Sequence, residues 1–101
     1  MIEDFLSIHD LTPHQVSHIF DLARQIKENP KLFKNRLKDK ILVMLFQKPS
    51  LRTRMTFEVG MIGLGGNAIY LGPSEVQLGI RESAYDVGKN LEQWVDGIMV
   101  R

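Results

Sequence analysis

The spacing of apolar residues predicts an amphipathic helix near the start of the chain. Apolar side chains recur at intervals of three and four residues, as on one face of a helix: Val16, Ile19, Phe20, Ala23 and Ile26. Thr12 and Gln15 match a capping box, and Pro13 suits the first helical turn. Asn29 precedes Pro30, which drives it out of helical geometry and ends the predicted helix.

Three further segments have the pattern of β-strands. Residues 41–46 are apolar without alternation, which is typical of a strand that is covered on both faces in a parallel sheet. Residues 67–71 form a second candidate strand, closed by Gly72 and Pro73, and residues 97–100 form a third.

Helix signals fill the two intervals between these strands. Ser50 begins the first helix, which ends at a cluster of glycines: Gly63, Gly65 and Gly66. Its apolar stripe consists of Leu51, Met55, Val59 and Ile62. Ser83 caps the second helix, with Asp86 in its first turn, and its expected buried stripe consists of Ala84, Val87, Leu91 and Trp94. Trp94 and four methionines are expected in the core: Met44, Met55, Met61 and Met99.

The order of these elements predicts an α/β fold, a parallel sheet with the order β-α-β-α-β that is preceded by an N-terminal helix. In such a sheet, ligands bind beyond the carboxyl ends of the strands. Three segments would meet there: residues 50–54, residues 75–81 and Arg101.

The start of the second predicted helix carries the strongest indication of chemistry. A helix N-terminus offers unpaired N–H groups and a partial positive charge, which together bind phosphate. This one also carries the hydroxyls of Ser50 and Thr53 and the guanidinium groups of Arg52 and Arg54. The same residues also fit a serine-capped helix whose arginines pair with acids such as Glu58. The local pattern does not distinguish the two interpretations.

Composition and charge narrow the function classes. The 101 residues suit one small domain, and 44% apolar with 25% charged residues is typical of a folded soluble protein. The 13 basic and 12 acidic residues nearly balance, which argues against a dedicated nucleic-acid-binding protein. Cysteine is absent, which excludes disulfides and thiolate chemistry. The longest apolar run, residues 41–46, is far short of the ~20 residues that span a bilayer, and the acidic start is unlike a targeting peptide. We therefore expect a cytoplasmic protein.

Three competing patterns are weaker. The basic connector at residues 31–40 is the best case for a nucleic-acid-binding module, but the balanced overall charge favours a solvated linker. His14 and His18 lie one helical turn apart without a third metal ligand beside them. Residues 63–68 match the dinucleotide pattern G-x-G-x-x-A, but they lie after a helix and before a strand, the reverse of the required order.

Residues 46–58 resemble a known family signature. The segment Ser50-Leu51-Arg52-Thr53-Arg54 is similar to the Ser-x-Arg-Thr-Arg motif of the aspartate and ornithine carbamoyltransferases. The resemblance covers nearly the whole chain from Phe5 onward, through residues 64–66, 70–74, 77–79, 81–83 and 95–101. The loop around Gln77 resembles the ornithine branch, because aspartate carbamoyltransferases carry a serine and a nearby lysine there.

The resemblance implies a part of a three-layer carbamoyl phosphate-binding domain. Residues 1–101 would be that N-terminal domain, cut short at its C-terminal end, with the second, amino-acid-binding domain absent. The whole enzyme would transfer the carbamoyl group of carbamoyl phosphate to the side-chain amine of ornithine, giving citrulline and phosphate. Acetylornithine, putrescine and aspartate remain open as acceptors. The fragment alone is expected to be inactive.

The resemblance also assigns roles to single residues. Ser50, Arg52, Thr53 and the backbone N–H of Leu51 would bind the phosphate of carbamoyl phosphate. Arg101 would contact both the phosphate and the carbamoyl oxygen, with Thr53 near that oxygen. The partners would be carbamoyl phosphate and an amine acceptor, and neither a metal nor an organic cofactor is implied.

The implied assembly is a homotrimer, or a multiple of trimers, in which Gln77 reaches the active site of a neighbouring subunit. Two residues depart from the family pattern. Leu51 replaces a common threonine and removes one hydroxyl, and Gln47 replaces the usual glutamate and removes one charge.

Overall fold

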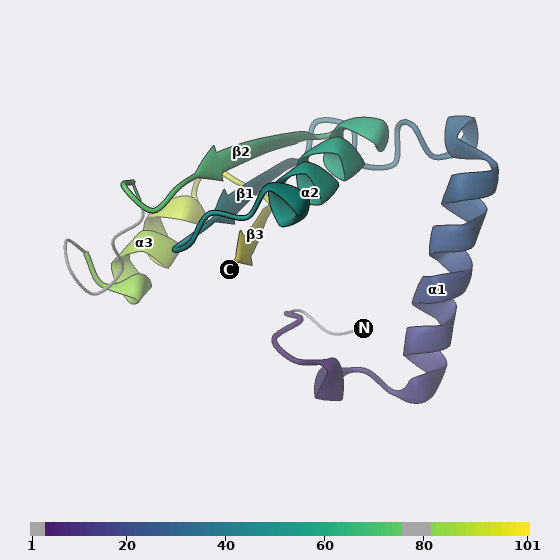
Figure 1. Ribbon diagram of the computed structural model, residues 1–101, viewed down its shortest axis with the longest axis horizontal. Coiled ribbons are helices and arrows are strands. Elements are labelled where there is room, and N and C mark those ends of the chain that lie inside the picture. The colour runs from purple at the N-terminus through teal and green to yellow at the C-terminus, as the bar shows by residue number, and fades with distance from the viewer. Residues whose placement is uncertain (1–3, 76–81) are drawn as a thin grey trace. The chain divides into compact units, whose positions relative to one another are not determined.

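The computed structural model describes residues 4–75 and 82–101, and the chain divides into two compact units, Met1–Phe33 and Lys34–Arg101. The first unit contains the 3₁₀ helix η1 (Ile8–Asp10), the helix α1 (Pro13–Glu28) and the 3₁₀ helix η2 (Pro30–Leu32). The second unit contains a parallel sheet with its helices (Figure 1).

The N-terminal helix forms as its sequence predicts. Thr12 Oγ1 accepts from the Gln15 N–H at 3.1 Å, and the Thr12 N–H donates to Gln15 Oε1 at 2.8 Å. This reciprocal capping box satisfies donors that the helix cannot pair itself. The helix ends at Glu28, directly before the Asn29-Pro30 stop. Local chemistry therefore defines both ends of α1.

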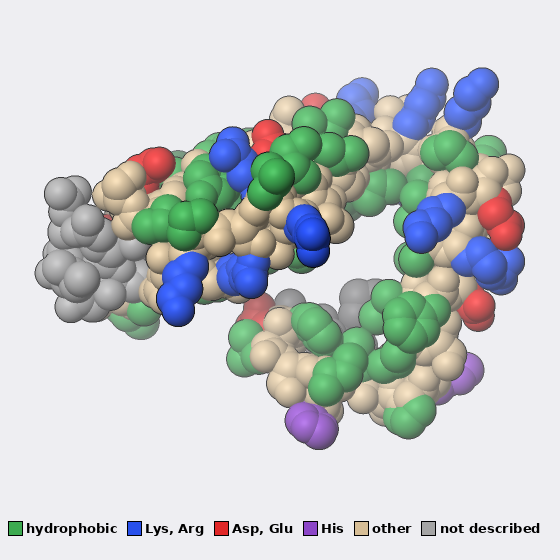
Figure 2. Space-filling view, in the orientation of Figure 1, with side chains coloured by type: hydrophobic (Ala, Val, Ile, Leu, Met, Phe, Trp, Pro, Cys, Tyr) green, Lys and Arg blue, Asp and Glu red, His purple; other side chains and the backbone are tan. Residues whose placement is uncertain are grey.

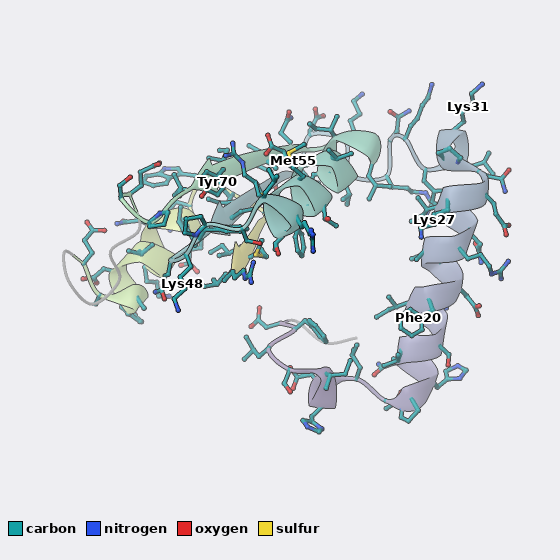
Figure 3. The ribbon with its side chains drawn as sticks, viewed as in Figure 1. Phe20, Lys27, Lys31, Lys48, Met55 and Tyr70 are labelled. Atoms are coloured by element: carbon teal, nitrogen blue, oxygen red, sulfur yellow. The ribbon has the colours of Figure 1, made fainter. Side chains whose placement is uncertain are left out.

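The apolar face of α1 stays open within its unit. Phe20 is 70% exposed and projects from the helix (Figure 3), and α1 has no buried residue. Beside this face lies a hollow of about 650 Å³, and green side chains line its visible part in Figure 2. Its apolar lining is Phe5, Ile8, Leu11, Val16, Ile19 and Phe20.

The second unit has the predicted α/β order. The strand β1 (Ile41–Leu45) is central, with β2 (Asn67–Leu71) on one side and β3 (Gly97–Val100) on the other. Both pairs of strands are parallel. The helix α2 (Leu51–Gly63) connects β1 to β2, and α3 (Ala84–Leu91) lies between β2 and β3. The central position of β1 explains why residues 41–46 are apolar without alternation.

Helices cover both faces of the sheet. On one face, Val43, only 1% exposed, and Leu45 pack against the α3 residues Val87 and Leu91. Because side chains alternate along a strand, the fully buried Met44 points to the opposite face. The second unit thus has three layers, helix, sheet and helix, as the family resemblance implies.

The helix α2 covers the opposite face of the sheet. Tyr70 on β2 is in register with Met44, so both side chains point to the same side of the sheet. The Arg54 guanidinium of α2 lies 4.0 Å from the centre of the Tyr70 ring. This contact places α2 on the face away from α3.

Predictions about the core are wrong at several positions. Trp94 is 68% exposed, since α3 ends at Leu91 and the stripe assumed from spacing does not extend to Trp94. Met55 on α2, labelled in Figure 3, is 47% exposed. The half-buried positions of α2 are Thr53, Glu58 and Met61, so the stripe that contains Met55 is not the less exposed side of the helix. Other members of the predicted stripes are exposed as well: Leu51, Val59, Ile62 and Ala84.

The glycine cluster ends α2 as predicted. The Gly66 N–H donates to the Met61 carbonyl at 2.8 Å, and the Gly65 N–H donates to the Ile62 carbonyl at 3.0 Å. Gly65 has a φ of +91°, which side chains rarely permit, and a Cβ there would meet the Lys34 carbonyl oxygen. The pattern G-x-G-x-x-A therefore runs from the end of α2 into β2, the helix-then-strand order expected from the sequence.

Candidate anion-binding site

The carboxyl ends of β1 and β3 hold the last residue, Arg101, in a fixed backbone position. The Arg101 N–H donates to the Leu45 carbonyl, and the Arg101 carbonyl accepts from the Gln47 N–H, both at 2.9 Å. These bonds continue the parallel ladder beyond the strands. The exposed Arg101 side chain therefore starts from an ordered point of the sheet edge.

Thr53 joins two of the predicted segments of the site, residues 50–54 and Arg101. Arg101 Nη1 donates to Thr53 Oγ1 at 3.1 Å, and the hydroxyls of Ser50 and Thr53 lie 3.0 Å apart. A guanidinium can only donate, so Thr53 is the acceptor from Arg101 and keeps its own hydroxyl hydrogen for another partner. Arg101 and Thr53 are 48 positions apart in sequence. The rule that parallel strands present their carboxyl ends at one edge correctly predicts this meeting.

The N-terminus of α2 differs from that of a capped helix. Ser50 occupies the N-cap position, but its side chain makes no capping hydrogen bond within the described chain. The first backbone donor of the helix is the Arg54 N–H, which bonds the Ser50 carbonyl at 3.1 Å. The preceding N–H groups, those of Leu51, Arg52 and Thr53, have no helical acceptor. The interpretation of Ser50 as a simple helix cap is therefore wrong.

The two arginines of this turn have different surroundings. Arg54 pairs with Glu58, with Nε and Oε2 3.3 Å apart, and stacks on Tyr70. This part of the capped-helix interpretation is confirmed. Arg52 is exposed and forms no ion pair with any residue in the described ranges. Arg52 is thus available to an outside anion, whereas Arg54 is engaged within the fold.

Positive charge gathers around this edge of the sheet. Figure 2 shows Lys and Arg side chains along the part of the second unit where β1 and β3 end, and Figure 3 labels Lys48 there. Together with the partial positive charge of the helix end, these groups favour a bound anion. The arrangement provides backbone donors, hydroxyls and guanidinium groups on one surface.

The remaining predicted residues are placed as follows. Leu51 is exposed and contributes its backbone N–H to the first turn of α2. Gln47 is exposed and lies beside Arg101 through the backbone bond described above. Gln77 lies outside the described residues. Sequence reasoning missed Tyr70 as a partner of Arg54, because no local pattern links a residue of the second predicted strand to the helix before it.

The structure gives no sign of a metal centre or a membrane span in the parts it describes. Residues 4–75 and 82–101 contain no group of three or more His, Cys, Asp or Glu side chains that could hold a metal ion. In these same ranges no helix is both long and apolar enough to cross a membrane. His14 and His18 therefore gain no further ligand within the described ranges.

Known proteins match nearly the whole of this chain, which covers only part of their own length. The ornithine carbamoyltransferase of Shewanella oneidensis is 44% identical over 100 residues, which are 99% of this chain and 33% of that protein. The putrescine carbamoyltransferase of Mycoplasma capricolum subsp. capricolum is 43% identical over 106 residues, covering 99% of this chain and 28% of that protein. The chain thus spans about a third of the length of these curated relatives.

Solved structures agree with the fold. The crystal structure of ornithine carbamoyltransferase from Thermus thermophilus superposes with a TM-score of 0.87 at 44% identity, covering 100% of this chain and 35% of that one. An acetylornithine transcarbamylase complexed with acetylcitrulline has a TM-score of 0.85 at 31% identity, covering 99% of this chain and 33% of that one. Residues 3–101 match the family described as aspartate/ornithine carbamoyltransferase, carbamoyl-P binding domain. The chain therefore belongs to the carbamoyl phosphate-binding domain family of the aspartate/ornithine carbamoyltransferases.

Proposed function

We propose that this chain is the carbamoyl phosphate-binding part of an ornithine carbamoyltransferase that acts in the cytoplasm. The observation that carries the proposal is the junction of Ser50, Thr53 and Arg101 at an uncapped helix N-terminus. Uncapped N–H groups and guanidinium groups together match the charge and geometry of a phosphate. Family membership supports carbamoyl phosphate as the phosphate compound.

We assign the phosphate to Ser50, Arg52, Thr53 and the Leu51 N–H. We assign Arg101 to the bridge between the phosphate and the carbamoyl oxygen. Because Thr53 accepts from Arg101, its hydroxyl hydrogen can be donated to a ligand oxygen. Arg101 would then polarise Thr53 as well as contact the ligand directly.

These roles suit carbamoyl transfer. The acceptor amine attacks the carbamoyl carbon, a C–N bond forms, and negative charge develops on the carbonyl oxygen. The C–O bond to phosphate then breaks, phosphate leaves with the bonding electron pair, and the proton that the attacking amine gives up passes to the departing phosphate. Donors that are already in place stabilise the developing charge without reorganisation, and holding both reactants together lowers the barrier further. The mechanism is electrostatic and positional, without a covalent enzyme intermediate.

We propose ornithine as the acceptor. It would bind in a second, amino-acid-binding domain outside residues 1–101. The loop sequence around Gln77 and the 44% identity to an ornithine carbamoyltransferase support ornithine. Relatives named for putrescine and acetylornithine keep those acceptors as alternatives, along with aspartate. We further propose a homotrimer in which Gln77 completes a neighbouring subunit's site.

The test is an acceptor panel with the longer protein that contains this chain. Carbamoyl phosphate is supplied with ornithine, acetylornithine, putrescine or aspartate, and each carbamoylated product is measured together with phosphate. The proposal predicts citrulline as the main product, and residues 1–101 alone are expected to form none. A preference for another acceptor would refute ornithine, and no product with any acceptor would refute carbamoyl transfer.

A further inference from the structure

Of the two arginines in residues 50–54, Arg54 is the one whose guanidinium contacts other side chains of the chain. Its Nε lies 3.3 Å from Glu58 Oε2, and its guanidinium carbon lies 4.0 Å from the centre of the Tyr70 ring. An exposed pair at i,i+4 on a helix contributes little alone. The stack on Tyr70 is different, because Tyr70 belongs to β2 and not to the helix.

Tyr70 is itself fixed by the ends of both strands. Its ring lies 5.2 Å from that of Phe46 at an interplanar angle of 53°, and Phe46 is fully buried directly after β1. On its other side the ring borders Gly72, where a Cβ would lie 3.0 Å from Tyr70 Cε2. The Phe46 N–H donates to the Leu71 carbonyl at 2.9 Å and holds the two strand ends together. Tyr70 is therefore a rigid platform.

We propose that Arg54 is a positioning residue whose stack on Tyr70 fixes the first turn of α2 against the strand ends. Arg54 directly follows Thr53, so a shift of Arg54 also moves the hydroxyl that meets Arg101 at 3.1 Å. The inference deepens the proposed function and rests on it. Displacements of about 1 Å at a reacting centre can cost on the order of 100-fold in rate.

The stack also explains why this position requires arginine. A guanidinium is planar and lies flat on an aromatic ring while its edge still donates to a carboxylate. A lysine ammonium keeps the charge, but it is not planar and cannot stack on the ring while it donates to the carboxylate. Lysine should therefore fail to replace Arg54 although the net charge is unchanged.

The variants that test this proposal are Arg54→Gln, Arg54→Lys, Tyr70→Leu, Tyr70→Phe and the double variant Arg54→Gln with Tyr70→Leu, all in the longer protein. We expect Arg54→Gln and Tyr70→Leu each to lower kcat/KM for carbamoyl phosphate roughly 10- to 100-fold. The acceptor KM should change less than about threefold, and Tyr70→Phe, which keeps the ring, should stay within about twofold. The double variant should be no worse than either single one, because both remove the same contact.

Arg24→Gln is the matched control. Arg24 also pairs with a glutamate at i+4, Glu28, at 3.5 Å on α1, and it has no part in the site. We expect its kinetics to equal those of the parent protein. A general loss of fold would change the acceptor KM as much as the carbamoyl phosphate kinetics and would lower the thermal unfolding midpoint. It would also lower the activity of Tyr70→Phe as much as that of Tyr70→Leu. This result would overturn the positioning role.

Amide hydrogen exchange across α2 separates this inference from the proposed function. Arg54→Gln and Tyr70→Leu should speed exchange in the first turns of α2, and Arg24→Gln should not, whether or not the protein turns over carbamoyl phosphate. Unchanged exchange in both site variants would overturn the inference and leave the proposed function standing. A large kinetic loss in Arg54→Gln with none in Tyr70→Leu would also overturn it, since Arg54 would then bind the ligand itself. A parent protein without carbamoyl transfer would refute the function only.

Discussion

The N-termini of α1 and α2 begin with similar residues and are built differently. At α1, Thr12 and Gln15 satisfy each other's backbone N–H groups through a capping box. At α2, Ser50 turns its hydroxyl to Thr53, 3.0 Å away, and caps nothing in the described chain. The first end uses its hydroxyl to stabilise the helix, whereas the second leaves its N–H groups open.

Under the proposed function, this difference leaves backbone donors of α2 for the phosphate. Leaving a helix N-cap unmade forgoes about 1 kcal/mol of stability. At α2 the forgone bond leaves donors at the place where Arg101 arrives from β3. At α3, Ser83 accepts from the Asp86 N–H at 3.1 Å, so an ordinary serine cap exists elsewhere in the same chain. A serine before a helix therefore does not by itself reveal which use it serves.

Removing Arg101 should have the largest effect. In the longer protein, Arg101→Ala should lower kcat about 100- to 1,000-fold, the range typical of losing one donor to a developing oxyanion. Steady-state turnover and carbamoyl phosphate affinity are the measurements, with Arg24→Ala on α1 as the control for losing a surface arginine. Unchanged turnover and unchanged affinity would refute the role of Arg101.

Replacing Thr53 by valine should have the next largest effect. The shape is retained, but the acceptor for Arg101 and the donor for the ligand are both lost. Because hydrogen bonds to charged groups contribute about 1.5–3 kcal/mol, kcat/KM should fall roughly 10- to 100-fold. Thermal unfolding should change little, since no helix cap is removed. A loss of stability without a loss of activity would reverse the comparison between the two ends.

The smallest expected effect is that of Thr12→Ala at α1. Loss of the cap should lower the free energy of unfolding by about 1 kcal/mol. Urea unfolding checks this value, and kcat/KM should stay within about twofold of the parent's. An activity loss larger than this, in a protein that is still folded, would mean that the α1 end does more than cap its helix.

Much of the fold could be predicted because local chemistry decides it. The capping box at Thr12, the stop at Asn29-Pro30 and the left-handed Gly65 are each fixed by a few neighbouring residues. The apolar run of β1 requires a central strand, and parallel order brings Arg101 to Thr53. The local features need only neighbouring residues, and the contact between Arg101 and Thr53 needs only the order of the strands.

The remaining features depend on contacts that no local pattern encodes. The contact of Arg54 with Tyr70 joins α2 to β2, and Met55 is exposed despite its helical spacing. Trp94 is exposed because α3 ends at Leu91, earlier than periodicity suggests. Ser50 fits a helix cap in every local respect, and the local sequence does not encode the contact of its hydroxyl with Thr53.

A paired serine substitution tests the central claim most directly. Ser50→Ala and Ser83→Ala are made in the longer protein, and carbamoyl phosphate affinity is measured by calorimetry beside the free energy of unfolding. We predict a crossed result, in which Ser50→Ala weakens binding roughly 10-fold or more with little change in stability. Ser83→Ala should instead cost about 1 kcal/mol of stability and leave binding intact. If Ser50→Ala lowers stability and leaves affinity unchanged, as expected for Ser83→Ala, then the N-terminus of α2 is an ordinary helix end and the account is wrong.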